Sequence, residues 1–258
     1  MLHVSDVHFG YHKARPVLRG VSCQIAPGAV TVIVGPNGCG KSTLLRLMLG
    51  TLCPLSGSIR FGEAAEGRGG RDVASFAASE RAARLAFVAQ RPEVWADYTV
   101  AEVAAFGRFA LGASASSVQR ALVAMQLADR ADESAAALSE GQRQRVSLAR
   151  VLAQFDGSKA GTAAFRAVLA DEPISAMDPR HAIAALGVLR AMKDERTAVV
   201  LVLHDLTLAL RFGDAAIVLA GDGTVAASGP IATTLTLDVV GRVFGTAFER
   251  HGPALIPV

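Results

Sequence analysis

The sequence predicts an α/β fold in which a parallel sheet with flanking helices carries a small N-terminal antiparallel sheet and an inserted helical subdomain. Three observations predict it. Residues 167–170 and 198–203 are apolar throughout and residues 30–34 are apolar except for Thr31, as strands of a parallel sheet are when both faces are buried. Short apolar runs separated by turn residues fill the first forty positions. Between residues 91 and 166, apolar residues recur at helical spacing.

The chain length and composition are compatible with one domain, residues 1–258. With 258 residues and 51% hydrophobic content, the chain can bury a complete core. We assign residues 1–90 and 167–227 to the sheet core with its antiparallel subdomain, residues 91–166 to the helical subdomain, and residues 228–258 to a C-terminal tail. No apolar run approaches the roughly 18 residues of a membrane helix, and we see no secretory signal.

The charge is mild, and the cysteine usage indicates reduced thiols. The net charge of +3 is spread along the chain without blocks of like charge, so we expect no nucleic-acid partner. The three cysteines, Cys23, Cys39 and Cys53, have no metal-binding spacing, which favours free thiols in a reducing compartment. We interpret Cys39 as a small buried residue and not as a reactive thiolate.

Secondary structure can be assigned in order along the chain. We predict strands at residues 2–4, 7–9, 17–18, 21–25, 30–34, 58–61 and 85–88, with a loop inserted at residues 62–79. In the helical region, Thr99 with Glu102 and Ser116 with Gln119 have the spacing of capping boxes. Buried strands follow at 167–170 and 198–203, and a final strand pair at 215–219 and 224–227 precedes the tail.

A phosphate-binding motif follows the strand at residues 30–34. Residues 35–42 have the Walker A pattern G-x-x-x-x-G-K-S, and a helix begins after it. Glycines let successive backbone N–H groups point inward, and the helix adds its positive end. The predicted nucleotide-binding residues are Gly35, Pro36, Asn37, Gly38, Cys39, Gly40, Lys41, Ser42 and Thr43. A glycine-rich turn with a surface lysine is the alternative interpretation.

Two acidic residues end the apolar strand at residues 167–170. Asp171 fits the Walker B carboxylate that holds Mg²⁺ together with Ser42. Glu172 points to the opposite side of the strand end and can act as the general base that activates water. An acidic pair after a strand is often only a helix cap, but its place after a Walker A motif favours the catalytic interpretation.

A second helix start has the character of an anion site. Ser139 and Gln142 have capping-box spacing, and Gly141 between them allows a phosphate to approach closely. The first N–H groups of a helix have no partner within it, so they attract anions. A chain with one phosphate loop needs no second such site for its own nucleotide. We therefore expect two chains to share two nucleotides.

Taken together, these motifs resemble the ATP-binding-cassette ATPases, with residues 138–142 matching the LSGGQ signature except that Glu140 replaces its first glycine. The resemblance covers nearly the whole chain. It implies a RecA-like P-loop NTPase core that binds ATP and Mg²⁺. It also implies roles for Tyr11 in stacking on adenine, for Gln90 in contacting Mg²⁺ and sensing the attacking water, for Asp178 in the D-loop, and for His204 near the γ-phosphate.

Three of these residues have simpler alternatives. Tyr11 could be a half-buried strand aromatic, and Gln90 could end a solvated turn. His204 could be a core histidine with one nitrogen satisfied. The other histidines, including His181, are interpreted as surface residues.

The resemblance further implies a task. A single cassette is similar to the separate ATPase subunit of a bacterial importer, which forms a homodimer on a membrane permease dimer at the cytoplasmic face of the inner membrane. Residues 90–94 through 106–108 would face the permease. The motif sequences are most similar to those of haemin-import ATPases, which implies haem uptake and an indirect link to a periplasmic haem-binding protein. Siderophore or cobalamin import is the alternative, and a soluble cassette acting on ribosomes or DNA is a more remote one.

Overall fold

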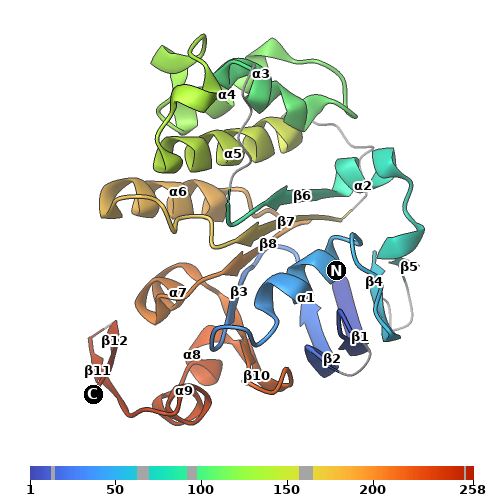
Figure 1. The fold of residues 1–258 in the computed structure, drawn as a ribbon, viewed down its shortest axis with the longest axis vertical. Coiled ribbons are helices and arrows are strands. Elements are labelled where there is room, and N and C mark those ends of the chain that lie inside the picture. Colours follow the sequence, from blue (N-terminus) through green and yellow to red (C-terminus); the bar gives the residue numbers. More distant parts are fainter. Residues whose placement is uncertain (13–14, 63–69, 92–97, 157–164, 253) are drawn as a thin grey trace.

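The computed structural model describes residues 1–12, 15–62, 70–91, 98–156, 165–252 and 254–258. The predicted loop at 62–79, the permease-facing stretch at 90–94 and the predicted helical subdomain at 91–166 therefore extend into gaps at 63–69, 92–97 and 157–164. At the centre of the described residues lies a twisted sheet of six strands (Figure 1). Its strands in spatial order are β10 (Val225–Pro230), β9 (Ala215–Leu219), β3 (Val30–Val34), β8 (Thr197–Val202), β7 (Arg166–Asp171) and β6 (Leu85–Val88).

The predicted parallel arrangement is confirmed. β3 pairs in parallel with β8 and with β9, β7 pairs in parallel with β8 and with β6, and β10 closes one edge antiparallel to β9. Every residue of β3 and β8 is buried, which explains why these strands are apolar without alternation. The parallel strands end at a common edge, and this edge carries the phosphate loop, the acidic pair and His204.

Alternate residues of β3 divide the core into two layers. Val30, Val32 and Val34 pack into one cluster with residues of the helical subdomain and of the helices near the C-terminus. Ile33 packs into a second cluster with the antiparallel sheet and the helix after the phosphate loop. A buried strand with one helical layer on each face is the arrangement that the uniform apolar runs predict.

The antiparallel sheet contains longer strands than the sequence indicated. Its order is β2 (Leu18–Ile25), β1 (Leu2–Phe9), β4 (Ser56–Phe61) and β5 (Arg71–Asp72). The runs at 2–4 and 7–9 are one strand, interrupted where Asp6 has φ +48° and the pairing register shifts. The prediction of a loop up to residue 79 is wrong for its described second half. There, β5, η1 (Val73–Ser75) and the start of α2 (Ala78–Arg84) form, because Asp72 caps the turn by accepting from Ala74 N–H.

The helices around the sheet and in the inserted subdomain occupy separate regions in Figure 1. Flanking the sheet are α1 (Lys41–Met48), α6 (Pro179–Ala191) and α7 (Leu206–Phe212). At one end of the molecule lie α3 (Val100–Ala105), η2 (Phe106–Arg108), α4 (Ala115–Ala124), η3 (Ala128–Arg130), η4 (Ala135–Ala137) and α5 (Glu140–Phe155). No helix among the described residues has the length and apolar character needed to cross a bilayer.

One of the two predicted caps in the helical subdomain is confirmed and one is wrong. Thr99 and Glu102 form a capping box at the start of α3. The cap of α4 is Ser114 and not Ser116, because Ser114 has extended backbone and its Oγ accepts from Ser117 N–H at 3.3 Å. Ser116 instead lies within the first turn of the helix.

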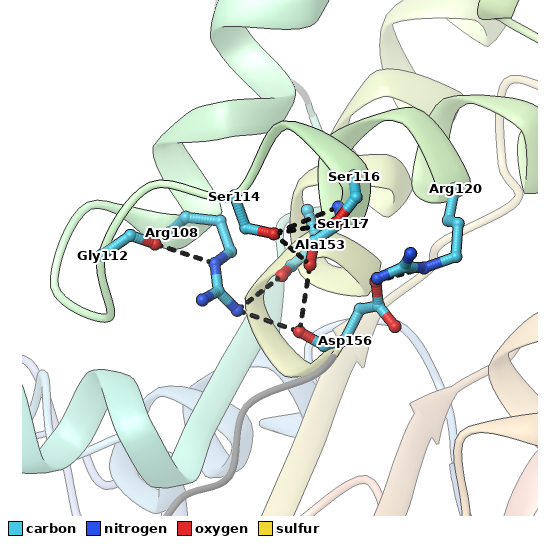
Figure 2. Close-up of polar contacts among 8 residues, drawn as sticks. All are labelled: Arg108, Gly112, Ser114, Ser116, Ser117, Arg120, Ala153 and Asp156. Atoms are coloured by element: carbon cyan, nitrogen blue, oxygen red, sulfur yellow. Dashed lines mark hydrogen bonds and ion pairs between the residues drawn. The ribbon is translucent and has the colours of Figure 1, made fainter.

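The last turn of α5 is capped by an arginine from η2 (Figure 2). The Arg108 side chain donates to the carbonyl oxygens of Asp156 at 2.9 Å, Ala153 at 3.4 Å and Gly112 at 3.0 Å, and the residue is buried. Helix C-terminal carbonyls have no partner within the helix, so this guanidinium satisfies them. Arg120, by contrast, pairs from the surface with the Asp156 carboxylate.

An aspartate before β9 joins three elements of the core. The Asp214 carboxylate accepts hydrogen bonds from the Val30 N–H at 2.9 Å, Arg190 at 2.8 Å and Lys193 at 2.5 Å. Burial raises the pKa of Asp214, but the hydrogen bonds from Lys193 and Val30 and the nearby positive charges outweigh this effect, so the net pKa is lowered. The ionised carboxylate therefore links α6 to β3.

The predicted tail, residues 228–258, contains secondary structure that the sequence analysis did not predict. β10 continues to Pro230. Beyond it lie α8 (Ile231–Thr234), α9 (Leu237–Phe244), β11 (Phe248–His251) and β12 (Ala254–Pro257). Val240 and Leu255 are buried in the main core cluster, so this segment covers part of the core near α7.

Candidate nucleotide-binding site

The phosphate loop joins β3 to α1 and ends at Gly40, a position that only glycine can occupy without strain. Gly40, the N-cap of α1, has φ +104°, and a Cβ there would lie 2.5 Å from Leu18 Cδ2. No side chain of the described residues caps α1, so the N–H groups of its first turn stay available. Free N–H groups and the positive end of the helix make this point an anion site.

Lys41 is held inside the loop. The residue is 6% exposed, and its Nζ donates to the carbonyl oxygens of Gly35 at 2.8 Å and Pro36 at 2.9 Å. Buried ammonium groups need such partners. The charge therefore lies within the curve of the loop, where phosphate oxygens would compete for it. A surface lysine on a glycine-rich turn is excluded by this burial.

Ser42 and Asp171 face each other across the start of α1 and the end of β7. Ser42 Oγ donates to Asp171 Oδ1 at 3.0 Å. Burial raises the pKa of Asp171; the hydrogen bond from Ser42 lowers it by less, and the charge of Glu172 raises it further. A hydroxyl and a carboxylate oxygen this close are ligands that Mg²⁺ prefers, and a cation would stabilise the buried carboxylate. These residues fit a magnesium site.

Glu172 joins the ends of three neighbouring strands. Its Oε2 accepts from Gln90 Nε2 at 2.8 Å, and its Oε1 lies 2.5 Å from His204 Nε2. Gln90 follows β6, Glu172 follows β7 and His204 follows β8. Glu172 has φ +46°, a left-handed conformation that non-glycine residues rarely adopt. The bend turns its side chain away from the Asp171 side of the strand.

Most of the predicted residues line one cavity of 780 Å³. Tyr11 lies at this cavity; it is 55% exposed, its hydroxyl lies 3.3 Å from Thr43 Oγ1, and its ring packs edge-on against Phe9. The described residues that line the cavity are Tyr11, Val17, Asn37, Gly38, Gly40, Lys41, Ser42, Thr43, Gln90, Glu172 and His204. His204 is exposed here and is not a core histidine.

Three loop residues and Asp171 do not line this cavity. Gly35 and Pro36 supply the carbonyls that hold Lys41. Cys39 is 1% exposed, and burial raises the pKa of its thiol, an effect that the charge of Lys41 opposes. The interpretation of Cys39 as a small buried residue agrees with this environment.

The remaining predicted residues gather at a second cavity of 470 Å³. Ser139 and Gln142 form the expected capping box at the start of α5. The second cavity is lined by Ser139, Glu140, Gly141, Gln142, Arg145, Ala176, Met177, Asp178 and His181. No described residue lines both cavities, so the start of α5 lies outside the set of residues that line the first cavity.

Gly141 is required by packing within the chain. A Cβ at this position would lie 2.5 Å from the carbonyl oxygen of Ala176. The start of α5 and residues 175–178 therefore approach as closely as backbone atoms allow. The sequence analysis assigned Gly141 only to phosphate approach and missed this contact.

Comparison with known proteins identifies the family. Residues 18–157 match the sequence profile of the family described as ABC transporter. The chain belongs to the ABC transporter family. The hemin import ATP-binding protein HmuV of Pseudomonas entomophila is 38% identical over 218 residues, 83% of this chain and 81% of that protein. The protein of the same name from Rhizobium meliloti is 36% identical over 249 residues, 95% and 91% of the two chains.

Solved structures give the same fold. A structure titled as the ATP binding subunit of an ABC transporter has a TM-score of 0.75 with this chain, 26% sequence identity, and coverage of 95% of this chain and 93% of the other. The predicted fold class is therefore confirmed. As a member of the ABC family, the chain is an ATPase that binds ATP.

In this ABC protein the sequence analysis missed one residue beside Asp178. His181 Nδ1 lies 2.5 Å from Asp178 Oδ2. The hydrogen bond with His181 lowers the pKa of Asp178, and the His181 N–H bond lowers it further. His181 is therefore partly exposed, in agreement with a surface position, but it has a defined partner at the second cavity. Its position three residues after an N-cap aspartate was the available signal.

Proposed function

We propose that this chain is the ATP-hydrolysing subunit of a bacterial importer and that it supplies the energy for haem uptake across the inner membrane. One observation carries the proposal for the reaction: the Glu172 carboxylate meets Gln90 and His204 beside the cavity that contains Lys41. The relatives named hemin import ATP-binding protein support the cargo.

The residues suggest how the reaction proceeds. Lys41 and the N–H groups at the start of α1 would bind the β- and γ-phosphates, with Tyr11 stacking on adenine. Ser42, Asp171 and Gln90 would hold Mg²⁺, which neutralises phosphate charge.

Glu172 would then take the proton from a water molecule. As the water oxygen attacks the γ-phosphorus, the bond to the bridging oxygen breaks, and ADP and phosphate leave. His204 is within hydrogen-bonding distance of Glu172, so it can orient that carboxylate and the water.

A homodimer would complete the site. Ser139, Gly141, Gln142 and Asp178 line the second cavity and stay apart from the first. In a dimer, the capped start of α5 in one chain would meet the γ-phosphate bound by the other chain. Separation of the two cavities within one chain supports this arrangement.

Exposed aromatic residues support docking on a membrane permease dimer. Tyr98 is 45% exposed, Phe106 is 38% exposed and Phe109 is 90% exposed, and the rings of Tyr98 and Phe106 lie 4.9 Å apart. Aromatic residues are enriched at protein interfaces. Tyr98 and Phe106 lie in the predicted permease-facing segment, whose residues 92–97 lie outside the described part of the chain, and Phe109 follows directly after it. Docking there would place the chain at the cytoplasmic face of the inner membrane.

Reconstitution tests the proposal. The wild-type chain should co-purify with a permease, and in liposomes its ATPase rate should rise when a haem-loaded periplasmic binding protein is added. The Glu172→Gln chain is the matched control, because it should assemble equally and remain inactive. Stimulation by a siderophore or cobalamin carrier, and none by the haem carrier, would overturn the cargo. Binding to ribosomes or DNA in place of a permease would overturn the importer assignment.

A further inference from the structure

The α5 helix lies along an edge of the parallel sheet. β6 is the edge strand, and alternate residues of a strand present their carbonyls to the same side. Side chains of α5 donate to three alternate carbonyls along this edge: Gln154 Nε2 to Leu85 at 2.9 Å, Arg150 Nη2 to Phe87 at 3.4 Å and Gln144 Nε2 to Ala89 at 3.2 Å. The helix that begins at Ser139 therefore follows the strand that leads to Gln90.

Gln144 makes the bond nearest to the reaction site. The residue is fully buried at 0% exposure, and its acceptor, Ala89, immediately precedes Gln90. The oxygen Oε1 is buried as well and has no hydrogen-bond partner among the described residues. A leucine would fill this space without a buried, unpaired Oε1, but it would leave the Ala89 carbonyl without this donor. Packing alone therefore does not account for an amide here.

The side-chain amides of Gln144 and Gln154 differ in their number of hydrogen-bond partners. Gln154 Nε2 contacts two carbonyls, those of Ala82 and Leu85. The bond to Ala89 is the polar contact of Gln144 in the described structure. If the end of β6 moved away from α5, the whole amide would be buried without a partner, which is unfavourable. The strand end and the helix are thus expected to move together.

We propose that Gln144 is a positioning residue that links the start of α5 to Gln90. Gln144 lies five residues after Ser139, and Gln90 donates to the Glu172 carboxylate. If the start of α5 shifted toward a nucleotide on a second chain, the hydrogen bond between Gln144 and Ala89 would move the neighbouring Gln90 with it. The position of Gln90 relative to the general base Glu172 would then change. This inference rests on the proposed function, because it assigns how that site senses the second chain.

The test compares two equivalent substitutions on one helix. Gln144→Leu should lower kcat for ATP by about 10-fold or more while affinity for a fluorescent ATP analogue stays within about 2-fold. Gln154→Leu removes hydrogen bonds from the same helix to Leu85 of the same strand and to Ala82 of α2, and its kcat should stay within about 2-fold of wild type. A double-mutant cycle adds a readout that general destabilisation would not produce. In a Gln90→Ala background, Gln144→Leu should lower kcat no further.

Each outcome decides the proposal. Equal losses in both leucine variants, or losses by Gln144→Leu and Gln90→Ala that multiply, would show a structural role only and overturn it. If Gln144→Leu does not fold, Gln144→Met, which keeps the unbranched shape, is judged by the same cycle. Wild-type hydrolysis with an unaffected Gln144→Leu variant refutes this inference alone. A wild-type chain that does not hydrolyse ATP refutes the proposed function, and this inference with it.

Discussion

Replacing Gly141 by alanine should destabilise the chain, whereas the same replacement at Gly187 should stabilise it. Both glycines lie in helices, Gly141 in the first turn of α5 and Gly187 within α6. A Cβ at Gly141 would lie 2.5 Å from the Ala176 carbonyl oxygen, and a Cβ at Gly187 would have no atom within 4 Å. Alanine should therefore raise helix propensity at both sites, but only at Gly141 does its Cβ clash with another part of the chain.

The size of the difference follows from these distances. Alanine in place of glycine within a helix gains about 0.5–1 kcal/mol. At Gly141, either α5 or residues 175–178 must move by about 1 Å to reach van der Waals distance, and overpacking of this kind costs about 1–3 kcal/mol. We expect Gly141→Ala to be destabilised by about 0.5–2 kcal/mol and Gly187→Ala to be stabilised by about 0.5–1 kcal/mol.

Thermal unfolding measures the contrast directly. For a chain of this size each kcal/mol shifts Tm by about 2–4 °C, so the two variants should differ by several degrees, with wild type between them. ATPase activity should fall for Gly141→Ala, because residues 176–178 line the second cavity, and should be unchanged for Gly187→Ala. A Gly141→Ala chain as stable as Gly187→Ala would refute the close approach of α5 to Ala176.

Three further predictions concern other contacts. Glu172→Gln should bind ATP normally while turnover falls by about 10²–10⁴-fold, as measured by phosphate release, and wild-type turnover would remove Glu172 from its role. Because Glu172 has φ +46°, Glu172→Gly should also be more stable than Glu172→Ala by about 1 kcal/mol in thermal unfolding. The lowered folded-state pKa of Asp214 means that its ionised form stabilises the fold above an unfolded pKa of about 4 and that this contribution is lost as pH falls through the folded value. The unfolding free energy of Asp214→Asn should therefore lie below that of wild type by about 1–3 kcal/mol at pH 7, and denaturant titrations should show the gap narrowing as pH falls below about 4. Arg108→Ala should cost about 2–3 kcal/mol and Arg120→Ala less than about 1 kcal/mol in the same titrations, because only the first removes a buried guanidinium and its hydrogen bond to the buried carbonyl of Ala153; equal costs would contradict the capping role of Arg108.

The parts of the site that bind phosphate could be predicted because the chemistry fixes both residue type and spacing. A lysine within a glycine loop, and a carboxylate at the end of a buried strand, need no knowledge of distant contacts. The structure brings Lys41, Ser42, Gln90, Glu172 and His204 to one cavity, as the motifs indicated.

Contacts between distant segments could not be read in this way. Ser114, Ser116 and Ser117 compete for one helix start, and the spacing to Gln119 selected the wrong serine, because local patterns do not reveal the preceding backbone conformation. The buried position of Leu255 depends on packing against α7, which is more than forty residues away in sequence. For the same reason, no local sequence pattern indicates the close approach of Gly141 to the Ala176 carbonyl.

The position of Tyr11 bears on which nucleoside triphosphate the chain accepts. It is one exposed ring beside the phosphate loop, and its neighbour Val17 at the same cavity offers no hydrogen-bonding side chain. Stacking engages the flat face that all nucleobases share and ignores the edge groups by which adenine and guanine differ. If the proposed stacking on Tyr11 is the main contact with the base, this chain should hydrolyse guanosine triphosphate nearly as fast as adenosine triphosphate.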